Sequence, residues 1–302
     1  MRAVRSVRPG LVQRASVRAP LDSTGYAAGV SLTRKEMRSI RSLRTRRGRE
    51  GSGRFLAEGV RVLEAASKSG TAPVLLVHAP ELSARAQALA DASARAGVRV
   101  ERVEAKALES LADTRSPQGI IAVFELPRRD LSDPVFSPPP EMSVIADGVS
   151  DPGNLGTLLR SALAFDAGAM ICAGGSADPW SPKVVRASAG AVFELPVART
   201  SHEALLEWLG LGDVRLIIAG SARRGAALPP FDAGAAAGGR RGAAVALAVG
   251  SEGEGVSAAL EGRASACWTI ETHPAVESLN AAVAGSILLE KLREWRRRQE
   301  PP

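Results

Sequence analysis

The residues best suited to chemistry lie beside glycine-rich turns in the second half of the chain. Asn154 and Arg160 follow an apolar run and stand in the stretch DPGNLGTLLR. An amide at the start of a helix, free backbone N–H groups and a nearby guanidinium together form a binding site for an anion. The spacing around Asn154 therefore favours a phosphodiester as the bound group. Two further turns follow near the end of the chain, GSEGEGVS (250–257) and TIETHPAVESLN (269–280).

The first of these turns is predicted to connect a strand over residues 143–149 to a helix whose N-cap is Asn154. Arg160 stands four residues after Gly156, so both occupy one face of that helix. Because helical side chains lean toward the N-terminus, Arg160 is expected to lie over the bare surface of Gly156 and to reach toward the helix start. The alternative interpretation is an arginine that is only solvated.

The spacing of the glycines excludes two common phosphate-binding loops. A P-loop requires the pattern GxxxxGK followed by Ser or Thr, and no lysine stands near Gly153 or Gly156. The dinucleotide fingerprint GxGxxG does not fit these glycines and Gly148 either. A later turn, residues 250–257, carries two glutamates, which would repel a phosphate. That turn suits an uncharged or cationic group instead.

Alternating apolar segments divide the chain into two α/β units. Residues 31–127 are predicted to form a small domain with a parallel or mixed sheet, beginning with a basic helix over residues 33–50. Residues 128–141 are rich in proline and indicate a linker. Residues 142–302 are predicted to form the second unit. Its expected strands are 143–149, 169–173, 192–198, 214–219, 243–249 and 267–270.

The second unit also contains a glycine-rich stretch and a C-terminal helix. Residues 225–244 are so rich in Gly and Ala that we expect a mobile loop there. Residues 278–300 are predicted to form a helix with Ser278 as its N-cap. The apolar stripe of this helix consists of Val283, Ile287, Leu288, Leu292 and Trp295.

Positive charge is concentrated at the beginning of the chain. Residues 1–50 contain thirteen Arg and Lys against three Asp and Glu, a net charge of +10, whereas the remaining 252 residues carry −3. This asymmetry indicates a polyanionic partner such as nucleic acid. Residues 1–30 are expected to be a disordered basic extension; a transit peptide or a start codon placed too early are the alternatives.

Several other classes of protein are disfavoured. No apolar run reaches the roughly 18 residues that a membrane-spanning helix needs. Cys172 and Cys267 stand alone in apolar surroundings, which is typical of buried thiols in a reducing cytoplasm. His78, His202 and His273 lack the spacing of metal ligands, so no metal site is expected.

Taken together and in this order, the motifs resemble the SpoU (TrmH) family of RNA ribose methyltransferases. The resemblance extends over about residues 33–293. In the second unit it rests on NLGTLLRSA (154–162), PKVVRASAGAVFELPV (182–197), GSEGEGVS (250–257) and VESLNAAVAGSILLEKL (276–292). In the first unit, residues 41–66 and 116–123 are similar to the RNA-binding domain that precedes the catalytic domain in this family.

The resemblance implies an α/β catalytic domain whose C-terminal segment forms a trefoil knot, preceded by a small α/β RNA-binding domain. It also implies a homodimer, no metal, and S-adenosylmethionine bound against backbone groups of Gly250, Ile270 and Leu279. The side chains that would surround the reacting ribose are Asn154, Arg160, Glu252, Ser278 and Asn280. The chain departs from the usual Ile-Pro-Met of the family, because Glu271 and Thr272 follow Ile270.

The expected function is that of a cytoplasmic, S-adenosylmethionine-dependent RNA 2′-O-ribose methyltransferase. Ribosomal RNA is the expected substrate, because an added basic N-terminal domain suits a structured rRNA segment. Transfer RNA is the alternative within the same class. The altered residues after Ile270 leave open a catalytically silent RNA-binding or ribosome-assembly protein.

Overall fold

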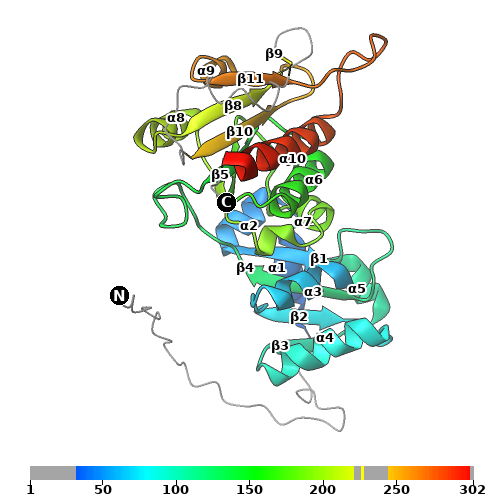
Figure 1. Ribbon diagram of the computed structural model, residues 1–302. Coiled ribbons are helices and arrows are strands. Elements are labelled where there is room, and N and C mark those ends of the chain that lie inside the picture. Colours follow the sequence, from blue (N-terminus) through cyan, green and yellow to red (C-terminus); the bar gives the residue numbers. More distant parts are fainter. Residues whose placement is uncertain (1–31, 221–225, 228–243, 300–302) are drawn as a thin grey trace.

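The computed structural model describes residues 32–220, 226–227 and 244–299. It contains two β-sheets, one in each half of the chain, and both can be followed in Figure 1. The predicted basic extension (1–30) lies outside the described residues. So does the predicted loop (225–244), apart from residues 226–227 and 244. None of the described helices is long and apolar enough to cross a membrane.

The first half of the chain forms a small domain around a mixed four-stranded sheet of order β1-β4-β2-β3. β1 and β2 both pair antiparallel with β4, whereas β2 and β3 are parallel. A mixed sheet was one of the expected arrangements. The elements are α1 (Arg34–Ser42), α2 (Arg46–Ser52), β1 (Arg54–Glu58), α3 (Val60–Lys68), β2 (Leu75–His78), α4 (Ala84–Arg95), β3 (Arg99–Arg102), α5 (Ala105–Leu111) and β4 (Ile120–Glu125).

The predicted basic helix over residues 33–50 is two helices, so that prediction was wrong in its length. Thr33 and Glu36 form a capping box at the start of α1. Thr45 then acts as the N-cap of α2, because its side chain accepts a hydrogen bond from Gly48 N at 3.1 Å. A threonine hydroxyl competes for backbone N–H groups in this way, and it starts a new helix where the arginine pattern continues.

The second half of the chain forms a parallel sheet of order β7-β6-β5-β10-β8-β11-β9. Parallel sheets need cover on both faces, and their strands are therefore almost continuously apolar. The elements are β5 (Met142–Asp147), α6 (Pro152–Ala164), β6 (Ala169–Ala173), α7 (Pro182–Ala187), the 3₁₀ helix η1 (Ala191–Phe193), β7 (Val197–Arg199), α8 (His202–Leu211), β8 (Arg215–Ala219), β9 (Ala226–Ala227), β10 (Val245–Gly250), α9 (Ala258–Glu261), β11 (Ala266–Thr269) and α10 (Ala281–Gln299).

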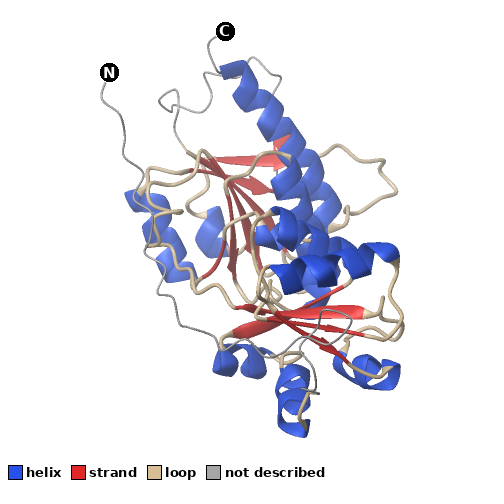
Figure 2. Cartoon of the chain, turned by 90° about the horizontal axis from the view of Figure 1, so that it is seen from below, coloured by secondary structure: helices blue, strands red, loops and turns tan. Residues whose placement is uncertain are grey.

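Helices cover both faces of this sheet, as Figure 2 shows. Apolar residues of α6, α7 and α10 pack on one face, and those of α8 and α9 pack on the other. One expected strand, 192–198, is instead the 3₁₀ helix η1 followed by the short strand β7. A short apolar run has no periodicity that separates a buried strand from a buried helical turn. Gly190, at φ 94°, provides the left-handed turn that starts η1.

The proline-rich stretch between the sheets is packed against the second half of the chain. Phe136 is fully buried with residues of α8, and its carbonyl accepts a hydrogen bond from Trp208 Nε1 at 2.8 Å. The stretch is therefore packed along the second sheet and is not an unpacked linker.

Aromatic rings and one buried ion pair join the two halves. Phe55 of β1 lies 4.9 Å from the ring of Trp180, and Phe124 of β4 lies 4.8 Å from the ring of Phe193 (centroid distances). Beside them, Arg49 Nη2 and Nε contact Asp178 Oδ2 at 2.5 and 3.0 Å; the Arg49 side chain is buried and that of Asp178 is largely buried. This contact fixes the small domain against α7 and the turn before it.

Candidate active site

The N-terminus of α6 is capped by Asp151, and the prediction that Asn154 is the N-cap is wrong. The Asp151 side chain accepts a hydrogen bond from Asn154 N at 2.8 Å, and Pro152 occupies the first turn. A proline at that position sets the backbone angle that a helix start requires. The helix therefore begins one turn earlier than expected, and the side chain of Asn154 is free to make other contacts.

Gly156 does not offer bare surface to an anion, so this expectation was also wrong. It is buried, and a Cβ there would lie 2.4 Å from Ala187 Cβ and 2.9 Å from Val184 O. The absence of a side chain allows α6 and α7 to approach each other closely. Arg160, one turn later, is exposed and has no hydrogen bond or ion pair with the described residues.

Three polar residues from distant parts of the chain meet at the start of α6. Asn154 donates a hydrogen bond from its amide to Glu252 Oε1, and it accepts one from Asn280 Nδ2 at 2.9 Å. Asn280 also accepts hydrogen bonds from Ala282 N at 3.0 Å and Val283 N at 3.2 Å. Asn280 is thus the residue that caps α10, and the prediction that Ser278 does so is wrong.

A cavity of about 630 Å³ lies at the carboxyl ends of the parallel strands. Its walls are formed by residues that end β8, β10 and β11 and by the start of α10. This edge of an open α/β sheet is where such folds bind ligands, and the volume falls within the roughly 300–1,000 Å³ that is usual for small-molecule sites. The residues expected at the site that line this cavity are Gly250, Glu252, Ile270, Ser278 and Leu279.

Glu252 belongs both to the cavity wall and to the set of three polar residues at the start of α6. It lines the cavity and also accepts the hydrogen bond from Asn154, which lies outside the cavity with Asn280. Arg160 neither lines the cavity nor forms a hydrogen bond with Asn154, Glu252 or Asn280, and its backbone stands six residues, about 9 Å of helix rise, beyond Asn154. The structure therefore brings seven of the eight expected residues to one region and leaves Arg160 one and a half turns along α6.

The loop between β10 and α9 forms one wall of the cavity. Ser251 and Gly255 exchange two backbone hydrogen bonds, of 3.1 and 3.0 Å, and this closes the loop into a compact ring. Gly250 lies against that ring, because a Cβ there would come within 2.0 Å of the Gly255 carbonyl carbon. Only a glycine fits at this position.

The lining of the cavity fits S-adenosylmethionine, which combines apolar, polar and cationic parts. Apolar side chains on the wall can cover an adenine, and backbone groups at strand ends can bind its edge. Carboxylates suit the sulfonium and ammonium charges of the cofactor. The apolar lining residues include Ile218, Val249, Ile270, Leu279 and Leu288, and the acidic ones are Glu252, Glu254, Glu261 and Glu277.

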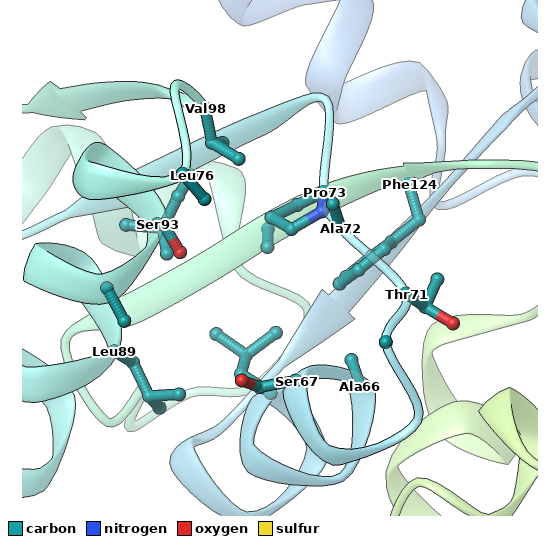
Figure 3. Close-up of a pocket in the computed structure, with 15 residues that line it drawn as sticks. Ala66, Ser67, Thr71, Ala72, Pro73, Leu76, Leu89, Ser93, Val98 and Phe124 are labelled. Atoms are coloured by element: carbon teal, nitrogen blue, oxygen red, sulfur yellow. The ribbon is translucent and has the colours of Figure 1, made fainter. Parts of the chain in front are cut away.

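The small domain contains a second, different cavity of about 190 Å³ (Figure 3). It lies between α3, α4 and the sheet, and it is lined by apolar side chains such as Leu76, Leu89 and Phe124. Ser67, Thr71 and Ser93 supply the only side-chain polar groups of this lining, and no charged residue contributes to it. This cavity therefore lacks the acids and bases that a reaction needs.

The two cysteines differ more than the sequence suggests. Cys172 is buried in β6, and burial raises the pKa of its thiol to about 12, which makes it unreactive. Cys267 is only partly buried and lines the cofactor cavity, so the prediction of a core thiol was wrong for it. Among the described residues, no group of three or more His, Cys, Asp and Glu could hold a metal ion.

The parallel sheet with its cavity beyond the strand ends defines an α/β enzyme of the cofactor-binding class. Comparison with family models is more specific: residues 141–290 match the SpoU rRNA methylase family, and residues 34–122 match an MRM3-like substrate-binding domain. The chain belongs to the SpoU family of methyltransferases and has the substrate-binding domain found among its members.

Individual relatives match along most of their length. The chain is 28% identical over 267 residues to the 23S rRNA (guanosine(2553)-2′-O)-methyltransferase RlmP of Bacillus subtilis, covering 87% of this chain and 98% of the relative. It is 30% identical to an uncharacterized tRNA/rRNA methyltransferase of Synechocystis, over 90% and 96% of the two chains. The AdoMet-bound rRNA methyltransferase from Sinorhizobium meliloti has a TM-score of 0.72 at 28% identity, over 91% and 98%.

Several residues around the site were not anticipated from the sequence. Asp151 caps α6, and its position before proline at a strand-to-helix turn was the available signal. Asp147, which ends the central strand β5 and is buried, contacts His202 and Ser257. A single acid after an apolar run gives no indication of which distant residues it will bind.

Proposed function

We propose that this chain transfers the methyl group of S-adenosylmethionine to a ribose 2′-hydroxyl of ribosomal RNA. The observation that carries the proposal is the position of Glu252, which lines the cofactor cavity and also binds Asn154 at the start of α6. A methyl donor and a ribose can therefore meet at this residue. The substrate class is supported by relatives named as 23S rRNA 2′-O-methyltransferases.

In this proposal the cavity holds S-adenosylmethionine, which supplies an electrophilic methyl group when bound. Backbone groups of Gly250, Ile270 and Leu279 hold its adenine part, since all three residues line the cavity. Glu271 and Thr272, which replace the usual Pro-Met of the family, leave Ile270 in the lining. The presence of all three residues in the lining supports cofactor binding over a silent RNA-binding protein.

The RNA side of the site consists of Asn154, Asn280 and Arg160. The two amides hold the ribose against Glu252, with Ser278 beside them on the cavity wall. Arg160 is exposed and free to bind the phosphate next to the reacting ribose. A guanidinium is hard to deprotonate in a protein, so its role is to orient that phosphate and to stabilise the negative charge that develops on the 2′-oxygen. The negative charge of the adjoining phosphate aids the loss of the hydroxyl proton to water as the 2′-oxygen takes the methyl group.

The small domain, residues 31–127, is proposed to bind the rRNA and to set the target nucleotide. Residues 128–141 connect it to the catalytic domain, residues 142–302. Its first two helices carry exposed arginines that make no contact with described acids, such as Arg34, Arg41 and Arg47. Charges of this kind bind a phosphate backbone without reading its sequence. We propose the cytoplasm as the compartment of the protein. In bacteria such as those of its relatives, ribosomal RNA is made in the cytoplasm.

The active form is proposed to be a homodimer that joins through α10. Val283 and Ile287 stand one turn apart and are 47% and 37% exposed, so the apolar stripe of α10 is only partly covered within one chain. Figure 1 shows the loop before α10 projecting from the body, and Val276 on that loop is also exposed. A second copy is the occupant proposed to cover this face. Light scattering should give a dimer mass that changes to a monomer mass in Val283→Glu/Ile287→Glu; a wild-type monomer would contradict the proposal.

The C-terminal segment is proposed to be threaded as the trefoil knot of the family. The position of β10 between β5 and β8 and the packing of α10 back on α6 support it, since both place the C-terminal segment among elements that precede it in the chain. An experimental structure in which residues 244–299 can be pulled straight without passing through another loop would contradict this part.

The substrate is tested by incubating the purified protein with isotope-labelled S-adenosylmethionine and with separate pools of unmodified rRNA and tRNA. The proposal expects label in rRNA. Label in tRNA alone would make tRNA the substrate in place of rRNA. Label in neither RNA, together with no binding of the cofactor in calorimetry, would contradict the assignment of the chain as an enzyme. The variant Glu252→Ala provides the inactive control.

A further inference from the structure

Asp147, His202 and Ser257 form a polar cluster next to the cofactor cavity. The side chain of Asp147 is 2% exposed at the carboxyl end of β5. Its Oδ2 accepts a hydrogen bond from Ser257 N at 2.7 Å, and its Oδ1 accepts one from His202 Nε2 at 2.6 Å. No step of the proposed reaction uses these groups.

We propose that Asp147 and His202 are positioning residues for the 250–257 loop, which they hold in the shape that forms the cavity wall and presents Glu252 to Asn154. This inference rests on the proposed function, because it assigns to the loop the task of holding the cofactor. Neither residue lines the cavity, so both would act through the loop and not by touching the cofactor.

The loop is attached to Asp147 at both ends. At its start, Gly250 of β10 is the register partner of Asp147 in the sheet. At its end, the Ser257 N–H binds the Asp147 carboxylate. Between these points the Ser251–Gly255 bridge closes the loop, and Glu252 lies within the closed ring. Releasing Ser257 would leave the ring attached at one end only.

The surroundings of Asp147 are built to hold a charged carboxylate. Burial by itself raises the pKa of Asp147, but the hydrogen bonds from Ser257 and His202 outweigh it, so the pKa lies below its ordinary value. Gly174, at φ 60°, leaves room for the pair, since a Cβ there would lie 2.2 Å from Asp147 Oδ1 and 3.1 Å from His202 Nε2. Three separate segments thus converge on one carboxylate.

The cluster is not a Ser-His-Asp relay, although it contains those residue types. A relay needs the acid and the serine on opposite nitrogens of the imidazole. Here Asp147 and the Ser257 hydroxyl both approach Nε2, at 2.6 and 3.4 Å. The carboxylate can only accept, so Nε2 carries the proton and donates it to Asp147. The arrangement serves to hold a structure in place.

The test compares Asp147→Asn with the matched control Asp166→Asn, whose carboxylate is exposed and pairs with Arg293. An asparagine offers one acceptor where two donors converge, so one donor loses its partner. We expect the affinity of the Asp147 variant for S-adenosylmethionine, measured by calorimetry without RNA, to fall about tenfold or more. Exchange of the Ser257 amide hydrogen should become faster, while rRNA affinity stays unchanged. The control should match the wild type in all three measurements.

A second pair of variants keeps the inference falsifiable where Asp147→Asn fails to fold. His202→Gln retains an N–H donor for Asp147 and His202→Ala does not, so cofactor affinity should be better retained in the glutamine variant. Equal affinities in the two variants, or an Asp147→Asn protein that binds the cofactor within about twofold of the wild type, would overturn the inference. A wild-type protein that binds no cofactor would instead contradict the proposed function.

Discussion

Asn280 Nδ2 donates a hydrogen bond to Asn154 Oδ1 at 2.9 Å, which joins residues 126 positions apart. The first stands at the start of α10 and the second in the first turn of α6. Two helix starts therefore meet beside the cavity, and their caps, Asp151 and Asn280, hold the first turns of both helices in place. The two amides are fixed relative to each other before RNA binds.

The two tasks of Asn280 can be separated by substitution. Asn280→Asp keeps an oxygen for the N–H groups of Ala282 and Val283, so the cap should survive, but it cannot donate to Asn154. Asn280→Ala loses both contacts and should cost about 1 kcal/mol of stability. We expect the unfolding temperature to be lowered only in the alanine variant and kcat to be lowered in both variants. An aspartate variant with normal kcat would show that the Asn154 contact is dispensable.

Arg160→Lys tests the proposed role of the guanidinium. A lysine keeps the charge but loses the planar pair of donors that binds a phosphate bidentately. Because Arg160 is exposed and contacts no described residue, the substitution should leave stability unchanged. Methyl transfer should fall about tenfold or more. Near-normal activity of this variant would contradict the proposal that Arg160 orients the phosphate.

Gly156→Ala should destabilise the protein although alanine is the better helix former. The added methyl would lie 2.4 Å from Ala187 Cβ, and such overpacking costs about 1–3 kcal/mol. The matched control is Gly210→Ala in α8, where nothing lies within 4 Å of the new Cβ. The control should be neutral or stabilise by up to about 1 kcal/mol. Chemical denaturation of the two variants measures the difference, and equal stability would mean that α6 and α7 are not in close contact.

Removing one partner of the Arg49–Asp178 pair should weaken the contact between the two domains. The side chains of Arg49 and Asp178 are 3% and 12% exposed, so Arg49→Ala leaves a largely buried carboxylate without its counter-charge and should cost about 3 kcal/mol. The double variant with Asp178→Ala should cost less than the sum of the single variants. Arg46→Ala, which breaks the exposed pair with Glu50, is the control and should change little. Additive losses in the double-mutant cycle would contradict a direct pair.

Glu36 should titrate well below other glutamates. Hydrogen bonds from Arg99 and from the Thr33 capping box lower its pKa from 4.5 to about 2. A lowered pKa in the folded state means that Glu36 contributes stability above pH 4.5 and that this contribution is lost as the pH falls toward 2. Carboxyl NMR shifts follow the titration directly. A midpoint near 4.5 would show that the contact of α1 with Arg99 of β3 does not persist in solution.

The sequence predicted the regular parts of the fold well and the helix starts poorly. β6 is a continuous apolar run and β8 is one after its first residue, Arg215, so their positions follow from local composition alone. The start of α6 was placed at Asn154 because an amide after a glycine resembles a cap. In the structure Asp151 is the cap instead, because the proline after it fixes the backbone of the first helical turn.

The candidate site shows the same limit at longer range. The motifs identified residues of the right type, but nothing in their spacing indicated that Asn154 would contact both Glu252 and Asn280. Gly156 was interpreted as open surface, whereas its neighbour is Ala187 of another helix. Contacts between segments far apart in the sequence depend on the sheet order and on helix packing, which local patterns do not contain.

The most direct test of the central claim is to locate the transferred methyl group on the RNA. After reaction with labelled S-adenosylmethionine, the rRNA is digested, and its nucleosides are separated by mass spectrometry beside a parallel alkaline hydrolysis. A ribose 2′-O-methyl group blocks the alkaline cleavage of the adjacent phosphodiester. The account predicts one labelled nucleoside carrying the methyl on its ribose, inside an alkali-resistant dinucleotide that is absent with Glu252→Ala. Label on a base, with every linkage open to alkali, would contradict it.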